Sequence, residues 1–241
     1  MRIFAKTDTG KVRSINQDAY AATVLPDGAA FAVVCDGMGG ASAGDIASKT
    51  SVDLISHYIL NAYTPSMDIE AIIKLMNNAI NSANMHIYDL SQRDENLYGM
   101  GTTVVIAIVR QSQAILCNVG DSRAYLVSND FVQLTRDHSV VQSLVESGKL
   151  SPEQAKNHPE KNVITRALGV EENIIIDSYT ASIGEDDKLL LCTDGLSNYV
   201  ADDEMFNTVK NSELDKVADV LIEKANNGGG RDNITAVVIS H

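Results

Sequence analysis

The sequence predicts an α+β fold in which two antiparallel β-sheets pack against each other and helices cover both outer faces, an α-β-β-α sandwich. Three observations support this fold class. The 241-residue chain carries two long and two shorter helical patterns together with about ten short apolar segments of strand character. Most of these segments follow one another through short turns, which is typical of antiparallel sheets. Apolar residues make up 44% of the chain, enough for a sizeable core.

The first part of the chain is expected to form three strands and two long helices. Strands are predicted at 3–6, 19–24 and 30–35. Helices are predicted at 43–62 and 68–92. The apolar face expected on the first helix consists of Ile46, Ala47, Thr50, Leu54 and Tyr58. The stripe expected on the second consists of Ile69, Ile73, Met76, Ile80, Ala83, Ile87 and Leu90, and both faces are expected to pack in the core.

The second part of the chain is expected to be richer in strands. An antiparallel meander is predicted at 102–109, 114–119, 124–127 and 131–134. Residues 135–169 are irregular, with short helical pieces and two of the four prolines, and we expect them to form a small flap subdomain or lid. Strands at 174–181, 188–192 and 234–239 and helices at 202–210 and 213–226 complete the pattern. No linker or repeat interrupts it, so residues 1–241 are expected to form a single domain.

Composition and charge exclude several classes of function. The net charge of −13 argues against non-specific binding to nucleic acid and against docking on anionic lipid. No stretch is apolar over the ~18 residues of a membrane span, and the first residues do not resemble a signal peptide. The three cysteines lie in apolar strand segments, which favours reduced core thiols and a cytoplasmic protein.

Five aspartates stand at the ends of strand segments, most of them beside glycines: Asp18, Asp36, Asp121, Asp194 and Asp232. Carboxylates repel one another, so they would converge only to hold hard cations. Oxygen ligands completed by water suit Mg²⁺ or Mn²⁺, whereas Zn²⁺ prefers histidine or cysteine. Spacing alone leaves a simpler interpretation open, because an Asp-Gly pair also serves as an ordinary turn or cap.

Six motifs occur in the order seen in the metal-dependent protein phosphatases of the protein phosphatase 2C family, and the resemblance covers essentially the whole chain. They are Arg13-x-x-Asn16-Gln17-Asp18, Asp36-Gly37-Met38-Gly39-Gly40, Gly101-Thr102-Thr103, Gly120-Asp121-Ser122-Arg123, Asp194-Gly195-Leu196 and Gly230-Arg231-Asp232-Asn233. The resemblance implies a β-sandwich flanked by helix pairs. It also implies a bacterial enzyme that hydrolyses phosphoserine and phosphothreonine in proteins and reverses a serine/threonine kinase.

The resemblance implies a metal site as well. Asp36 would bridge two Mn²⁺ or Mg²⁺ ions, the Gly37 carbonyl would bind one of them, and Asp194 and Asp232 would complete the other. Asp121, together with Asp194, would hold a third and weaker ion. A water that bridges two ions could then attack phosphorus in line, without a phosphoenzyme.

Three further positions bear on catalysis. Arg13 matches the family's phosphate-binding arginine, and Asp18 matches a residue that orients metal-bound water. Met38 stands where many eukaryotic members carry a histidine that is the proposed general acid, although bacterial members often share this methionine. A metal-bound water near Asp121 is the candidate acid in its place.

The segment 135–169 resembles the flap of bacterial members, which varies and helps to choose substrates. For its histidines, His138 and His158, we expect packing or surface roles.

Three other functions deserve comparison. Cys117 and Arg123 fit the Cys-x₅-Arg signature of cysteine-based phosphatases, but the residues after Arg123 predict a strand where that mechanism needs a helix. A docking module that has lost catalysis would be expected to lack some of the aspartates. A metal nuclease would need basic surface, which the composition does not favour. We therefore expect a monomeric enzyme whose partners are phosphoproteins and a cognate kinase.

Overall fold

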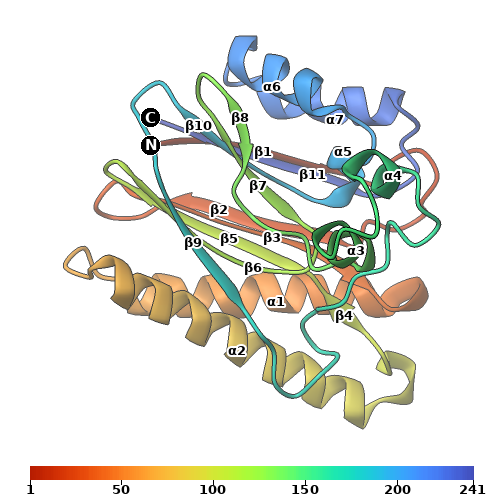
Figure 1. The fold of residues 1–241 in the computed structure, drawn as a ribbon. Helices are drawn as coiled ribbons and strands as arrows, with labels where there is room; N and C mark the ends of the chain where they lie inside the picture. The colour runs from red at the N-terminus through yellow and green to blue at the C-terminus, as the bar shows by residue number, and fades with distance from the viewer.

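The structure is a computed structural model that describes residues 1–39 and 43–241 in full and only the helical backbone of residues 40–42. Two antiparallel sheets are stacked face to face (Figure 1). In order across the first sheet lie β1 (Arg2–Asp8), β11 (Ile234–Ser240), β10 (Lys188–Cys192), β7 (Arg123–Val127) and β8 (Phe131–Gln133). In order across the second lie β2 (Asp18–Val24), β3 (Ala30–Met38), β5 (Val104–Arg110), β6 (Gln113–Val119) and β9 (Asp177–Ser182), with β4 (Gly101–Thr102) paired to the end of β3.

Two helix pairs enclose the sheets, which confirms the predicted α-β-β-α sandwich (Figure 1). The pair α1 (Gly40–Ala62) and α2 (Ile69–Arg93) covers the outer face of the second sheet. The pair α6 (Asp202–Asn211) and α7 (Val217–Asn227) covers the outer face of the first. The helix α2 begins where the Asp68 carboxylate accepts the Ala71 N–H at 2.8 Å, a regular N-cap.

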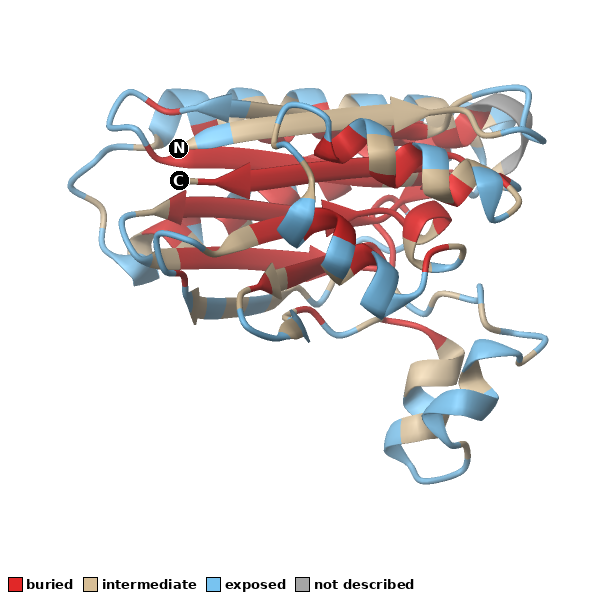
Figure 2. Ribbon diagram, turned by 90° about the horizontal axis from the view of Figure 1, so that it is seen from above, coloured by how far each residue is buried: buried red, intermediate tan, exposed pale blue. Residues whose placement is uncertain are grey.

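The core has three layers because alternate residues of a strand point to opposite faces of its sheet. On β3, Ala32 and Val34 pack between the sheets, whereas Val33 and Cys35 pack toward α1 and α2. Figure 2 shows the central strands buried, the edge strands β1, β2, β8 and β9 partly exposed, and the outer sides of the helices exposed. All three cysteines are free and buried, as the sequence predicts.

The predicted apolar face of α1 is wrong in part. Ile55 and Ile59 are fully buried, while Ile46 is 38% exposed and Thr50 is only partly buried. This helix carries apolar residues on two adjacent faces, so helical spacing alone does not select the one that packs on the sheet. The predicted stripe on α2 is largely correct, although Ile69 at its start is 40% exposed.

The predicted meander is wrong at one connection, between β6 and β7. β5 and β6 pair with each other, but the chain then crosses to the other sheet, where β7 pairs with β10 and β8. The crossing occurs at residues 120–122 and uses Gly120, whose φ of +107° is unfavourable for other residues. An alternation of apolar residues with a period of two identifies strands, but it does not show which strands pair with each other. Asp121 therefore lies between the two sheets.

The segment that we expected to form a flap stands away from the sandwich (Figures 1 and 2). It carries α3 (Val140–Glu146), capped by Ser139, and α4 (Pro152–Lys156), where Ser151 and Gln154 form a capping box. The next strand, β9, begins at Asp177, three residues later than predicted. Two short helices, η1 (Glu95–Leu97) and α5 (Asp194–Ser197), have too few residues for a periodic pattern to reveal them. Among the helices that the structure describes, none is long and apolar enough to cross a lipid bilayer.

Candidate active site

One end of the sandwich gathers all five aspartates that the sequence singled out. Asp18 opens β2 and stands opposite Asp36 of β3 in the antiparallel register, and both belong to the second sheet. Asp194 follows β10 by two residues, at the start of α5, and Asp232 precedes β11 by two residues, so both stand at the end of the first sheet. Asp121 lies in the crossing between the sheets. The carboxylates therefore come together only when both sheets are in place.

A pocket of about 480 Å³ opens at this end. Its wall includes four of the aspartates together with Arg13, Gly37 and Met38. It also includes Asn162 and Ile164 from the segment 135–169, so this segment contributes to the pocket. The predicted set of site residues thus surrounds one cavity, with Asp18 buried behind it.

Asp18 is held by two threonines. The hydroxyls of Thr193 and Thr235 donate hydrogen bonds to its Oδ2 at 2.8 and 2.7 Å. Its Oδ1 is buried and accepts no hydrogen bond from any described residue. Burial raises the pKa of Asp18 to about 7, although the two threonine hydroxyls oppose this shift. An oriented carboxylate with one unsatisfied buried oxygen is suited to a cation or to a water that a cation holds.

The other carboxylates also destabilise one another. Burial, followed by repulsion from Asp18 and Asp194, raises the pKa of Asp36 well above its ordinary value. Burial and repulsion from Asp194 raise the pKa of Asp121 to about 8. The pKa of Asp194 rises to about 6 for the same two reasons, burial and the charge of Asp232. A cation in the pocket would remove this repulsion.

The donor set fits hard divalent cations. Four carboxylates line the pocket, and carboxylate oxygens suit Mg²⁺ and Mn²⁺. Within the described residues, no three acidic, histidine or cysteine side chains form a ready-made metal cage. Ions that use one or two carboxylates and keep several waters do not need such a cage.

Close backbone packing explains two glycines of the site. A Cβ on Gly37 would lie 2.0 Å from the Gly44 carbonyl oxygen, and a Cβ on Gly195 would lie 1.8 Å from the Asn233 carbonyl oxygen. Both contacts are far shorter than real side chains allow. Gly39, the second glycine of the Asp36 motif, has a φ of +122°, and Gly40, the third, begins α1.

The loop that carries Arg13 is tied to the Asp232 strand. Asn233 accepts the Gln17 N–H at 2.8 Å and donates to the carbonyls of Thr9 and Ile15 at 3.0 and 2.9 Å. Arg13 is half-exposed, and its Nη2 donates to Asp232 Oδ2 at 2.9 Å. The guanidinium therefore stands at the pocket with donors to offer an anion.

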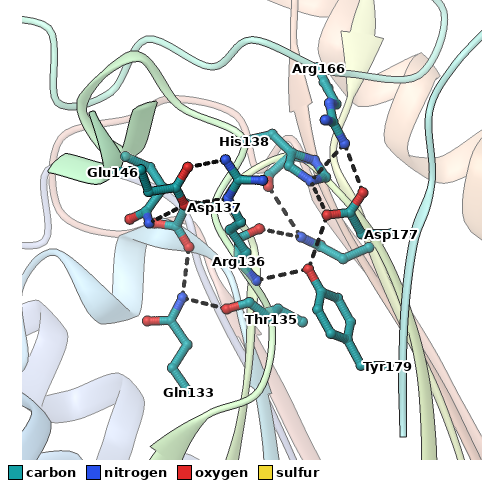
Figure 3. Close-up of polar contacts among 12 residues, drawn as sticks. Gln133, Thr135, Arg136, Asp137, His138, Glu146, Arg166, Asp177 and Tyr179 are labelled. Atoms are coloured by element: carbon teal, nitrogen blue, oxygen red, sulfur yellow. Dashed lines mark hydrogen bonds and ion pairs between the residues drawn. The ribbon is translucent and has the colours of Figure 1, made fainter. Parts of the chain in front are cut away.

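The Asp121 loop is clamped by the first residues of the flap segment, of which Figure 3 shows Asp137 and His138. The backbone N–H of Gly120 donates to the ring Nδ1 of His138 at 3.0 Å, and the backbone N–H of His138 donates to the Gly120 carbonyl at 2.9 Å. On the other side of Asp121, Arg123 forms a two-pronged hydrogen-bonded ion pair with Asp137. His138 is buried and lies 3.2 Å from Asp177 through Nε2. The expected packing role of His138 is thus a specific one, since it holds the backbone next to Asp121.

The sequence missed several of these supporting residues. Thr193 directly precedes Asp194 and Thr235 follows Asp232 by three residues, but their hydrogen bonds to Asp18 span 175 and 217 residues of chain. Asn233 is the last residue of the motif that contains Asp232, but the sequence pattern indicated no role for it. His138 had only the sequence neighbours Asp137 and Ser139 as a signal.

The cysteine mechanism finds no support in the geometry. Cys117 is fully buried in β6, where its sulfur lies 3.4 Å from Asn77 Oδ1 and from Ser178 Oγ. It does not line the pocket. Burial raises the pKa of its thiol to about 11, which disfavours a nucleophilic thiolate.

Comparisons with known proteins point to one family. The family model described as protein phosphatase 2C matches residues 11–227. The serine/threonine phosphatase stp of Listeria innocua is 42% identical over 236 residues, which cover 97% of this chain and 93% of that protein. The crystal structure of serine/threonine phosphatase Stp1 from Staphylococcus aureus superposes with a TM-score of 0.92 at 32% identity, covering 99% of this chain and 94% of that one.

A further solved structure includes metal. The catalytic domain of the serine/threonine protein phosphatase PstP, in complex with two manganese ions, matches with a TM-score of 0.86 at 32% identity, covering 98% of this chain and 96% of that one. The motifs, the fold and the relatives all lead to one conclusion: the chain belongs to the protein phosphatase 2C family, as a bacterial-type serine/threonine protein phosphatase.

Proposed function

We propose that this phosphatase depends on Mn²⁺ or Mg²⁺ and hydrolyses phosphoserine and phosphothreonine in proteins with two ions in its core site and a weaker third. The observation that carries the proposal is the buried Oδ1 of Asp18, which has no hydrogen-bond partner among the described residues and lies behind a pocket lined by four more aspartates. We also propose that residues 1–241 act as one catalytic domain, with 135–169 as its flap.

The bound ions would supply positive charge to the phosphate and a water of lowered pKa to attack phosphorus in line. Asp36 would bridge them, because it is the carboxylate that interacts with all four others. The Gly37 carbonyl, next to it, would bind one ion, and Asp194 and Asp232 would bind the other. Asp121 would help Asp194 to hold the weaker third ion.

Two residues of the chain would act on the water and the phosphate. Asp18 would accept a hydrogen bond from the attacking water through its free Oδ1, because the two threonines occupy its other oxygen. Arg13 would turn from Asp232 to the phosphate, for which its planar fork of donors is well matched. Met38 lines the pocket but has no proton to donate, so a proton for the leaving alkoxide would come from water near Asp121.

We further propose the cellular setting that the family resemblance implies. The enzyme would be a cytoplasmic monomer that acts on phosphoproteins and reverses the work of a serine/threonine kinase. The free, buried cysteines support a reducing compartment.

The test is hydrolysis of a phosphothreonine peptide by the full chain after EDTA treatment and desalting, before and after Mn²⁺ is added, with bound metal measured by calorimetric titration. We expect activity to disappear with the metal and to return with it. Asp36→Asn should nearly abolish activity and weaken Mn²⁺ binding, because it removes the shared charge. Activity that persists in protein shown to be free of metal would overturn the proposal.

Asp53→Asn is a matched control, since Asp53 is an exposed aspartate on α1 outside the pocket. It should keep both the activity and the affinity for Mn²⁺. A folded protein that binds Mn²⁺ but hydrolyses neither the peptide nor p-nitrophenyl phosphate would instead indicate a docking module.

A further inference from the structure

A second hollow adjoins the catalytic pocket. It has a volume of about 320 Å³, which is at the small end of the range for ligand pockets. It shares two wall residues, Met38 and Ile164, with the catalytic pocket. The rest of its wall comes from the end of the flap segment and the chain that leads to β9: Thr165, Arg166, Ala167, Val170, Glu171, Asn173, Ile174 and Ile175. We call this hollow the apolar groove.

The groove exposes apolar side chains that the fold does not need. Val170 is 46% exposed and Ile175 is 68% exposed on its wall, and Val163, just before it, is 45% exposed. Three exposed large apolar residues thus occur within thirteen positions of an acidic protein. Apolar surface that remains exposed in one place commonly marks an interaction site.

The groove is held in shape by the body of the protein. Leu168 and Thr102 exchange two backbone hydrogen bonds, at 3.1 and 2.8 Å. Asn84 of α2 accepts the Gly169 N–H at 2.8 Å and donates to the carbonyls of Glu171 and Glu172, both at 3.0 Å. These contacts fix residues 168–172, which join the two stretches of chain along the groove wall, before any ligand arrives, so binding would cost little ordering.

Figure 3 shows how one wall residue is kept in place. The Arg166 guanidinium donates to Asp177 Oδ1 at 2.9 Å and lies 3.1 Å from His138 Nε2. The charge of Arg166 is therefore already paired with a carboxylate of the protein. Glu171, on the exposed rim, would repel an acidic ligand.

We propose that the apolar groove binds an aliphatic or aromatic side chain of the substrate polypeptide, close in sequence to the phosphorylated residue. The inference rests on the proposed function and extends it to substrate choice. A phosphate group is the same in every phosphoprotein, so discrimination needs contacts outside the catalytic pocket. An extended peptide advances about 3.3 Å per residue, so a neighbour within about four positions of the phosphothreonine can reach a groove that shares a wall with that pocket.

The experiment compares phosphothreonine peptides that differ only by leucine or serine at one position, with that position moved through the about four residues on either side of the phosphothreonine. We expect kcat/KM to rise about tenfold for leucine at one position, the usual size of a discrimination between side chains in a small apolar pocket. The double variant V170S/I175S should reduce that preference to near unity. Both residues are exposed, so the variant should fold.

Two controls make the outcome specific. V132S changes a valine of equal exposure on β8, outside the groove, and should keep the leucine preference. Hydrolysis of p-nitrophenyl phosphate, which has no polypeptide, should be unchanged in V170S/I175S. Hydrolysis of p-nitrophenyl phosphate also tests the proposed function separately. It should still require Mn²⁺ whether or not the enzyme distinguishes leucine peptides from serine peptides.

Three results would overturn the inference. The first is a wild-type enzyme that is active on the peptides but indifferent to leucine at every position. The second is a leucine preference that survives in V170S/I175S. The third is a dimer in size-exclusion chromatography that V170S/I175S dissociates, since a second copy would then occupy the groove.

Discussion

Replacing Gly195 with alanine is expected to push apart two strand ends that carry aspartates of the site. The added Cβ would lie 1.8 Å from the Asn233 carbonyl oxygen, and no real side chain approaches closer than 3.0 Å. The segments would therefore have to separate by about 1.2 Å. Asp194 stands directly before Gly195, and Asp232 stands directly before Asn233.

The expected size of the effect follows from this displacement. Overpacking of a closely packed contact costs about 1–3 kcal/mol of stability, which corresponds to a fall in melting temperature of roughly 2–12 °C for a chain of this length. Metal-ligand distances tolerate about 0.2 Å, so Mn²⁺ affinity should fall markedly. A misplacement of about 1 Å costs about a hundredfold in rate, and we expect a loss in kcat/KM of at least that order.

Calorimetric Mn²⁺ titration, thermal unfolding and phosphopeptide hydrolysis measure the three effects. Gly28→Ala is the control, because nothing lies within 4 Å of its Cβ. Its φ of +83° should cost about 1 kcal/mol of stability without any change in Mn²⁺ affinity. If Gly195→Ala bound Mn²⁺ and turned over like the wild type, Asp194 and Asp232 would not be the ligands that we propose.

Two further predictions concern His138 and Cys117. Burial lowers the pKa of His138 below its ordinary 6.5 in spite of the hydrogen bond with Asp177, so the unfolded chain takes up this proton first as the pH falls. As the pH falls from about 7 to 5, the free energy of unfolding measured in urea should therefore decrease more for the wild type than for His138→Gln. The aspartate cluster contributes equally to both proteins. Equal decreases in the two proteins would contradict the lowered pKa of His138. Cys117→Ser should keep its activity on a phosphopeptide within about twofold, because the sulfur is buried away from the pocket. A folded but inactive variant would bring the cysteine mechanism back.

The features of the fold that depend on neighbouring residues in the sequence could be predicted. Apolar runs with a period of two identified the strands, and Asp68 marked the start of a helix that begins there. The partner of β7 was missed because pairing between distant strands depends on the whole core, and no local pattern encodes it. The buried face of α1 was missed for a similar reason, since two of its faces are apolar.

The site divides in the same way. An aspartate at the end of a strand segment is visible in the sequence, and the structure brings all five of these aspartates to one end of the sandwich. The contacts that hold these aspartates in place are not visible in the sequence. Thr235 donates to Asp18 across 217 residues, and His138 holds Gly120 through a single ring nitrogen. Such supporting contacts become recognisable only when the strands are placed in space.

The pairing of β1 with β11 has a consequence for how the protein is made. β11 lies between β1 and β10 in the first sheet, and Asp232 stands just before it. A ribosome adds about 5–20 residues per second, so β1 waits for roughly 10–50 s before its partner is synthesised. Until then the first sheet has open edges, which invite association with other chains, and the carboxylate set lacks Asp232. A nascent chain of this enzyme is therefore expected to be inactive, and phosphatase activity would begin only after residue 240 has left the ribosome.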